Sequence, residues 1–330
     1  MTPTRTPLDA TRWHWQHGPI DLILAADGDA PALHAAYEAC WARFAEILPE
    51  LVAELKRLRA PVDPHASLDT CGVQGPVARR MWSACQPHST RYITPMAAVA
   101  GSVADELIAA FARDGISRAY INNGGDIALY LGEGQQYRVG VFADLAQWRG
   151  AQSALKHGPS RTNDLALDAS LTLDATQPVR GIATSGWRGR SFSLGIADSV
   201  TVLARDAARA DAAATMIANA VDVPHPGILR RPAASLKDDS DLGDIPVTVH
   251  VPALPLPLID IALARGIDAA RRLREQGLIE GAALFLQGQI RVTGIPDDTR
   301  ALPGRRDQTT QHTQNIQKTQ EAPCSKYAAC

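Results

Sequence analysis

The sequence predicts an α+β fold in which mainly antiparallel strands are packed against helices. Strand-like runs follow one another across short turns, as in residues 13–25 and 117–131, and longer helical patterns interrupt them. Strands and helices do not alternate regularly, and no G-x-G-x-x-G sequence follows a predicted strand. These two observations disfavour a doubly wound dinucleotide-binding fold.

The chain has 330 residues, of which 45% are hydrophobic, and a chain of this kind can bury a sizeable core. We predict a single domain over residues 1–300. From Ala301 onward Gln, Thr and charged residues dominate the composition. We therefore predict that residues 301–330 form a disordered low-complexity tail.

Composition also bears on partners and location. The 33 basic and 35 acidic residues give a net charge of −2, and aromatic residues make up 5% of the chain, so we expect no nucleic-acid partner. The first residues contain no apolar signal-peptide core, and no apolar run is long enough to cross a membrane. Five separated cysteines without a CxxC pair indicate reduced thiols and a cytoplasmic protein. The sequence leaves the oligomeric state open.

The N-terminal third is predicted as a hairpin followed by helices. The expected elements are a loose leader over residues 1–11, a hairpin over 13–25, a helix over 30–59 and a short helix over 75–85. Pro49 is expected to kink or split the longer helix, because proline lacks the N–H of a helix interior.

A further helix is predicted over residues 94–107. Thr94 is placed to cap it, with Pro95 at the first helical position. Only small side chains, such as Ala100 and Gly101, occupy its first turns. Two interpretations stay open: a helix N-terminus that receives an anion, or a helix packed tightly against a sheet.

Strands are predicted over residues 117–121 and 127–131, with a turn at Asn122–Asp126 between them. The sequence of this turn, Asn-Asn-Gly-Gly-Asp, brings amides and a carboxylate to one point, which is more than a hairpin requires. Residues 136–143 and 165–173 are predicted as further strands, and residues 144–164 as an irregular polar segment.

The segment over residues 180–221 carries the clearest candidate site. A strand over 180–185 ends in Thr184-Ser185-Gly186, which lacks the G-x-S-x-G context of a nucleophile, so Ser185 is expected to hydrogen-bond a ligand. A strand over 199–204 and a helix over 205–221 follow. Asp211 and Thr215 are four residues apart in that helix and share one face, where both can offer oxygens to a hard cation.

The C-terminal part is predicted as a polar loop, a strand, a helix and a closing hairpin. The expected ranges are the loop over 232–245, the strand over 247–251, a breaker over 252–257, the helix over 258–276 and the hairpin over 282–292.

Four segments between residues 92 and 221 resemble, in order, motifs of the ApbE-like family, the FAD:protein FMN transferases. The family motifs are Lys-Gly-x-Ala-x-Asp, Asn-x-Gly-Gly-Asp-Ile, Ala-Thr-Ser-Gly, and Val-Thr-Val followed by Ala-Asp-Ala-x-Ala-Thr. The matching residues are Gly101 to Asp105, Asn122 to Ile127, Ala183 to Gly186, and Val200 to Thr215. More closely, the chain resembles an uncharacterised branch of that superfamily. The resemblance implies an ApbE-like, T-fold-related α+β fold.

The resemblance also implies a site for FAD and Mg²⁺. By the family pattern, Asp211, Thr215 and the backbone carbonyl near Val99 hold the metal, and Asp211 is a candidate proton acceptor. The residues implied in flavin-nucleotide binding are Met96, Asn122, Gly124, Gly125, Asp126, Thr184, Ser185 and Gly186. The implied reaction is transfer of FMN from FAD to a Thr or Ser of an acceptor flavoprotein, or hydrolysis of the FAD pyrophosphate.

Two positions depart from the family pattern. Ala100 stands where the family has Lys, and residues 191–198 replace the family's His-x-x-Asp-Pro-x-Thr-Gly segment. Two alternatives therefore stay beside the transferase: a non-catalytic flavin- or nucleotide-binding protein, and a protein of the same fold with another small-molecule substrate.

Overall fold

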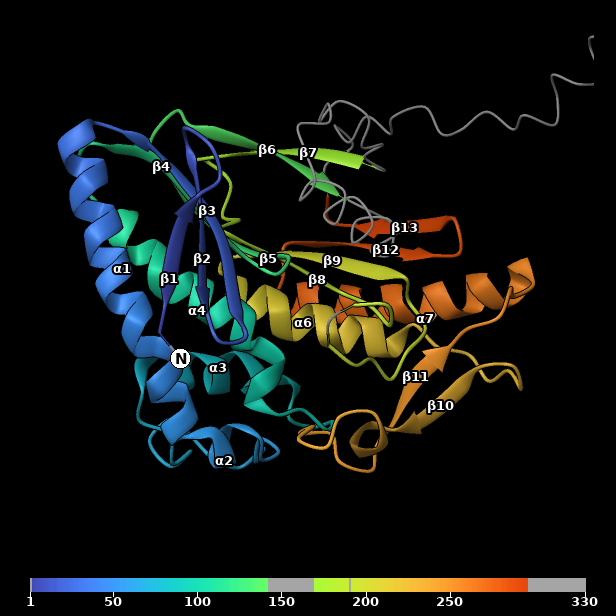
Figure 1. Ribbon diagram of the computed structural model, residues 1–330. Coiled ribbons are helices and arrows are strands. Elements are labelled where there is room, and N and C mark those ends of the chain that lie inside the picture. The colour runs from blue at the N-terminus through green and yellow to red at the C-terminus, as the bar shows by residue number, and fades with distance from the viewer. Residues whose placement is uncertain (1, 142–168, 190, 296–330) are drawn as a thin grey trace, which may run out of the picture.

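The computed structural model describes residues 2–141, 169–189 and 191–295, and within them a nine-stranded sheet runs through the molecule (Figure 1). Every neighbouring pair in this sheet is antiparallel. In spatial order its strands are β1 (Thr4–Pro7), β2 (Arg12–His17), β3 (Ile20–Gly28), β4 (Ile116–Asn123), β5 (Asp126–Leu131), β8 (Gly181–Ser185), β9 (Ser199–Ala204), β12 (Gly281–Leu286) and β13 (Gln289–Thr293).

Two small hairpins and a set of helices complete the described residues. The hairpins pair β6 (Gln136–Val141) with β7 (Ala169–Asp174), and β10 (Leu229–Pro232) with β11 (Pro246–His250). The α-helices are α1 (Ala30–Ala53), α2 (Leu55–Leu58), α3 (Pro76–Cys85), α4 (Val99–Ile108), α6 (Ala207–Ala220) and α7 (Leu256–Glu275). The 3₁₀ helices are η1 (Gln86–His88), η2 (Pro95–Ala98), η3 (Ala109–Phe111) and η4 (Ala233–Ser235).

The two faces of the sheet carry different layers, because successive side chains of a strand point to opposite faces. On β5, Ala128 joins the core under the helices, whereas its neighbour Leu129 joins a smaller cluster. That smaller cluster includes Leu171 and Leu173 of β7, so the β6–β7 hairpin covers the face opposite the helices (Figure 1). The helix layer itself holds two clusters, one under α1, α3 and α4 and one under α6 and α7.

Helix α6 lies unusually close to its neighbours, and glycines permit this. A Cβ placed on Gly101 of α4 would lie 2.2 Å from the carbonyl oxygen of Ala207, and one on Gly181 of β8 would lie 2.0 Å from the backbone of Asp206. Neither approach is compatible with a side chain. Gly101 at the start of α4 therefore serves tight packing against another helix, α6, whereas the packing interpretation left open by the sequence was contact with a sheet.

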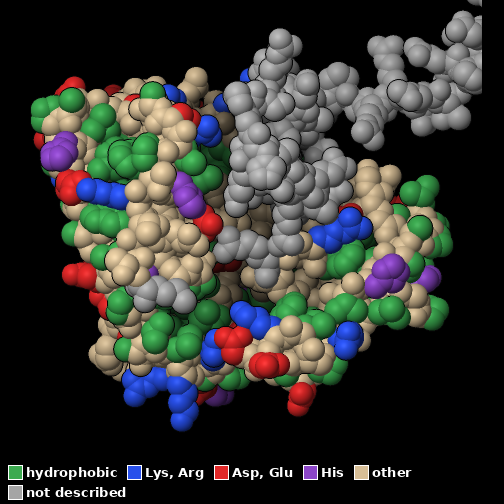
Figure 2. All heavy atoms as spheres, viewed as in Figure 1, with side chains coloured by type: hydrophobic (Ala, Val, Ile, Leu, Met, Phe, Trp, Pro, Cys, Tyr) green, Lys and Arg blue, Asp and Glu red, His purple; other side chains and the backbone are tan. Residues whose placement is uncertain are grey.

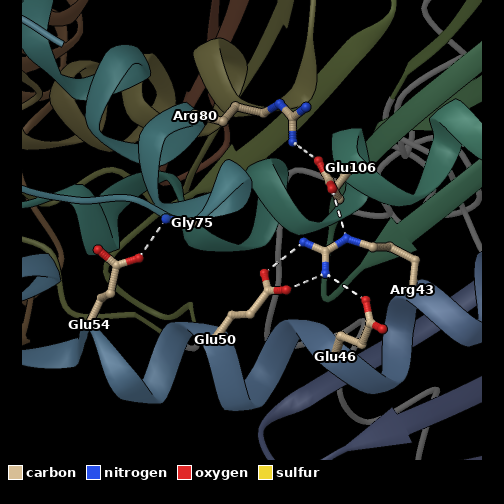
Figure 3. Close-up of polar contacts among 7 residues, drawn as sticks. All are labelled: Arg43, Glu46, Glu50, Glu54, Gly75, Arg80 and Glu106. Carbon is tan, nitrogen blue, oxygen red and sulfur yellow. Dashed lines mark hydrogen bonds and ion pairs between the residues drawn. The ribbon is translucent and has the colours of Figure 1, made fainter. Parts of the chain in front are cut away.

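A network of charged side chains fixes α4 against α1 and α3 (Figure 3). Arg43 of α1 binds Glu50 through two hydrogen bonds of 2.7 and 2.8 Å, and its Nε donates to Glu106 of α4 at 2.8 Å. Arg80 of α3 donates to the same Glu106 at 2.7 Å. These charged hydrogen bonds lower the pKa of Glu106 although partial burial opposes this effect.

The predicted fold class is confirmed: helices pack on a mainly antiparallel sheet. Most predicted elements are present with shifts of a few residues at their ends. Two parts of the predictions, the polar segment over 144–164 and the tail over 301–330, lie outside the described residues. The single-domain boundary at residue 300 stays a prediction.

Three local predictions need correction. The expected loose leader contains β1, which pairs with β2 at the edge of the sheet although all four residues of β1 are exposed. Helix α1 continues through Pro49 and breaks only at Glu54. Thr94 precedes η2 but its side chain does not cap that helix, because its hydroxyl donates to the carboxylate of Asp241 instead.

Within the described ranges, none of the helices combines the length and the apolar character that a crossing of the lipid bilayer requires. On the face drawn in Figure 2, basic and acidic side chains are interspersed.

Candidate functional site

Four segments that are distant in the sequence meet beside the start of α4. The side-chain amide of Asn123, at the end of β4, donates to the carbonyl oxygen of Ala100 at 3.1 Å. The carboxylate of Asp211, on α6, accepts from the N–H of Gly101 at 3.0 Å. Asp126, at the start of β5, accepts from the N–H of Thr184 at 3.2 Å. The four motif segments found in the sequence are therefore neighbours in space.

The turn between β4 and β5 is built by its glycines and by one asparagine. Gly124 and Gly125 adopt φ values of 69° and 120°, which residues with side chains rarely adopt. The N–H of Gly125 donates to the side-chain oxygen of Asn122 at 2.8 Å. Among the described residues, no atom outside the chain neighbours of Gly125 lies within 4 Å of the position that a Cβ on this glycine would occupy, so these residues leave room for an approaching group on this side of the turn.

The electrostatics at Asp211 are those of a crowded, poorly solvated carboxylate. Loss of solvation raises the pKa of Asp211 well above its usual range, and the nearby negative charge of Asp126 raises it further. Hydrogen bonds from the N–H groups of Gly101 and Ala100 act in the opposite direction. A divalent cation between such carboxylates would offset their mutual repulsion, so the charge distribution suits a metal ion.

A second carboxylate, Asp105, makes the reciprocal contact between α4 and α6. It accepts from the N–H groups of Ala207 and Ala208, the first two residues of α6, at 2.9 and 2.8 Å. Burial, followed by the charge of Asp206, raises the pKa of Asp105 from 3.8 to about 7. Asp105 thus satisfies N–H groups that a helix start leaves without partners.

The predicted metal ligands lie on α6 and at the start of α4. Thr215 follows Asp211 by one turn of α6 and is partly exposed, and Val99 is the first residue of α4, two residues before Gly101. These groups offer only oxygen atoms, the donors that Mg²⁺ prefers. Among the residues that the structure describes, no cluster of three or more His, Cys, Asp or Glu side chains suited to a metal is found.

The predicted ligand turn after β8 contacts β9 and the backbone of Asp198. The hydroxyl of Thr184 lies 3.0 Å from that of Thr201 on β9. Ser185 ends the strand and is partly exposed, and a Cβ on Gly186 would lie 2.4 Å from the carbonyl oxygen of Asp198. Met96, in η2, is partly buried and packs against the core under α1, α3 and α4. Roles for these residues in ligand binding stay predictions.

The segment that replaces the family's His-containing stretch folds back onto the core. The N–H of Ile196 donates to the carbonyl oxygen of Val221 at 2.8 Å, beyond the end of α6. Asp198 accepts from the N–H of Gln287 at 2.6 Å and from the indole of Trp187 at 3.3 Å. Asp198 therefore serves the contact between this segment and the β12–β13 turn.

Three residues of the site were not predicted from the sequence as site residues. Asn123 lies inside the Asn-Asn-Gly-Gly-Asp turn, and its contact with α4 depends on a register that the sequence does not reveal. Asp105 was matched to a family motif without a role. Asp241 comes from the polar segment between β10 and β11 and reaches Thr94 beside η2, a contact that no local pattern signals.

Comparison with known proteins supports the family relationship. A family model described as "AbpE bacteria" matches residues 4–292. The chain belongs to this family. The matched range runs from β1 into β13 and includes all four motif segments, and the predicted resemblance to an uncharacterised ApbE-like branch is confirmed.

Curated relatives of this AbpE family member carry the name UPF0280 protein. The protein from Methanosarcina acetivorans is 30% identical over 223 residues, which is 67% of this chain and 76% of the relative. The protein from Methanothrix thermoacetophila is 36% identical over 164 residues, or 49% of this chain and 56% of the relative. The chain thus spans about half to three quarters of the length of these two relatives.

Two solved structures are similar at low sequence identity. An ApbE protein from Thermotoga maritima is 12% identical with a TM-score of 0.40, covering 88% of this chain and 96% of that chain. The flavinyl transferase ApbE from Pseudomonas stutzeri, in its apo form, is 15% identical with a TM-score of 0.39, covering 89% and 95%.

Proposed function

We propose that this chain binds FAD together with Mg²⁺ and transfers the FMN half of FAD to a Ser or Thr hydroxyl of an acceptor protein. The observation that carries the proposal is the meeting of α6, the start of α4 and the β4–β5 turn through Asp211, Gly101 and Asn123. These are the segments whose motifs resemble the FMN transferases, and the family model spans them all.

In this proposal Asp211, Thr215 and the carbonyl of Val99 hold the metal ion. When bound, Mg²⁺ would polarise the pyrophosphate and stabilise the charge that develops on the leaving AMP. The open side of the Asn122–Asp126 turn and the end of β8 at Thr184-Ser185-Gly186 orient the nucleotide through backbone and side-chain hydrogen bonds.

The transfer step breaks the phosphoanhydride bond of the FAD pyrophosphate and forms a phosphoester bond to the acceptor. The acceptor hydroxyl oxygen bonds to the phosphorus of the FMN half, the bond from that phosphorus to the bridging oxygen breaks, and AMP leaves. In this proposal the hydroxyl proton passes to a carboxylate, either Asp211 or its neighbour Asp126.

Two departures from the family pattern favour a second candidate function, the binding of a flavin nucleotide without transfer. Ala100 replaces the family's lysine, and the segment over residues 191–198 contains no histidine. A Cβ on Gly195 would lie 2.1 Å from the carbonyl oxygen of Ala218, so this segment is packed closely on α6.

The test is to incubate the full chain with FAD and Mg²⁺, with and without candidate acceptor flavoproteins, and to measure released AMP. We expect AMP from the wild type and a loss of at least about tenfold in Asp211→Asn. Asp114→Asn is the matched control, since Asp114 is exposed in the turn before β4. Absence of AMP above the no-enzyme background for every acceptor would reject the transferase.

Thermal unfolding, read together with AMP release, separates the two candidate functions. Both require that FAD raise the melting temperature only when Mg²⁺ is present, and that Asp211→Asn lose this effect. Because the Asn side chain can still accept from the N–H of Gly101, the ligand-free melting temperature reports separately on folding. Protection without AMP release would support binding without transfer, and no protection of the wild type would reject the metal site.

A further inference from the structure

A cavity lined by three arginines lies between the end of α6 and one face of α7. Its volume is about 360 Å³, and its lining residues are Arg91, Asn219, Ala220, Arg265, Asp268 and Arg272. Small-molecule sites begin at about 300 Å³, so the cavity has room for a small ligand. It lies apart from Asp211, since Asn219 follows that residue by eight positions, about 12 Å along the helix axis.

Four of the six residues that line this cavity, three arginines and one asparagine, carry side-chain hydrogen-bond donors. Arg265 and Arg272 are seven residues apart and share one face of α7 with Asp268. Arg265 donates through Nη1 to the carbonyl oxygen of Asp222 at 2.9 Å, which positions its guanidinium and leaves further N–H groups available. The three arginines and one aspartate give the lining a formal charge of +2.

The asparagine in the cavity adds a donor of its own. The side-chain oxygen of Asn219 accepts from the N–H of Leu194 at 2.9 Å and from the hydroxyl of Ser193 at 3.3 Å. Its NH₂ group is therefore left for a ligand. The single acidic residue, Asp268, pairs with Arg271, at 3.6 Å, and this contact draws part of its charge away from the cavity.

We infer that this cavity is a binding site for a phosphate group carried by a small molecule, separate from the proposed flavin site. Guanidinium groups match the geometry and charge of phosphate oxygens better than any other side chain. Three of them from two segments, with one amide donor, form a receptor for a dianion. The site goes beyond the proposed FMN transfer, which requires no anion there.

The test is calorimetric titration of the full chain with inorganic phosphate and with phenyl phosphate, at constant ionic strength. We expect saturable binding of phosphate or of the phosphomonoester, weakened about tenfold in each of Arg265→Gln and Arg272→Gln, since a hydrogen bond to a charged group contributes this much. Asp268→Asn should bind more tightly. Tighter binding of phenyl phosphate than of phosphate would identify an organic phosphate as the ligand, and the reverse would identify the free anion.

Arg274→Gln is the matched control, because Arg274 is an exposed arginine of α7 that donates to the carbonyl oxygen of Glu280 and does not line the cavity. We expect it to leave the dissociation constant within about twofold. Asp211→Asn should leave phosphate binding unchanged, which keeps this result separate from that of the flavin site. Absence of saturable binding, equal weakening by Arg274→Gln and Arg272→Gln, or equally strong competition by acetate would overturn the inference.

Discussion

Asp105 and Asp211 cap each other's helices. Asp105 of α4 accepts from the first two N–H groups of α6, and Asp211 of α6 accepts from the N–H of Gly101 in the first turn of α4. The two helices therefore run antiparallel, with each N-terminus facing a carboxylate of the other. Since helix N-termini attract negative charge, both contacts are favourable. Asp211 consequently stabilises the fold as well as being the predicted metal ligand.

The first prediction concerns Asp105, the residue of this pair whose contacts only stabilise the fold. Replacement of Asp105 by alanine leaves the N–H groups of Ala207 and Ala208 without their acceptor, and we expect the free energy of unfolding to fall by about 1–2 kcal/mol. Chemical denaturation of the purified chain measures this change. Asp114→Ala, at an exposed position, should stay within about 0.5 kcal/mol of the wild type. Equal effects of the two substitutions would contradict the capping role of Asp105.

The second prediction concerns the pH dependence that Asp105 confers. Burial raises its pKa from 3.8 to about 7 in the fold. Because the folded-state pKa lies above the unfolded-state value, its contribution to stability is fully present below the unfolded pKa and is lost as the pH rises through about 7.

The direction of this pH dependence can be measured against Asp105→Asn, whose side chain does not titrate. The difference in unfolding free energy, wild type minus variant, should decrease steadily between pH 4 and pH 7, about the two pKa values, and then level off. Denaturation curves at half-unit intervals give this difference. A difference that is constant or that increases with pH would show that the pKa of Asp105 is not raised.

The sequence revealed the site's segments but not their contacts. Asp211 and Thr215 could be placed on one helical face from their spacing, because the helical period is fixed. The turn at Asn122–Asp126 could likewise be predicted, since two adjacent glycines favour it. The contact of Asn123 with Ala100 could not, because it depends on how a strand end and a helix start are packed together.

Contacts between distant segments explain the other features that could not be predicted from the sequence. Thr94 has the residue type and the position of a helix cap, yet its hydroxyl binds Asp241, which is 147 residues away in the chain. Arg91 and Arg272 have no local pattern that sets them apart from solvated arginines, and the cavity becomes visible only when α7 lies beside the end of α6. Tertiary packing decides these cases, and local propensity does not.

The last prediction links the glycine at the helix crossing to the proposed ligand site. A Cβ on Gly101 would lie 2.2 Å from the carbonyl oxygen of Ala207, so Gly101→Ala must separate α4 from α6 and weaken both reciprocal caps. We expect a loss of about 3 kcal/mol in unfolding free energy, together with loss of Mg²⁺-dependent protection by FAD at temperatures where the variant is folded. Gly134→Ala is the control: Gly134 has φ of 70°, and no atom of the described residues beyond its chain neighbours lies within 4 Å of its Cβ position. The substitution should therefore cost about 1 kcal/mol from backbone strain alone and keep the protection. If Gly101→Ala retained full protection, the close contact between α4 and α6 would not be needed to form the site.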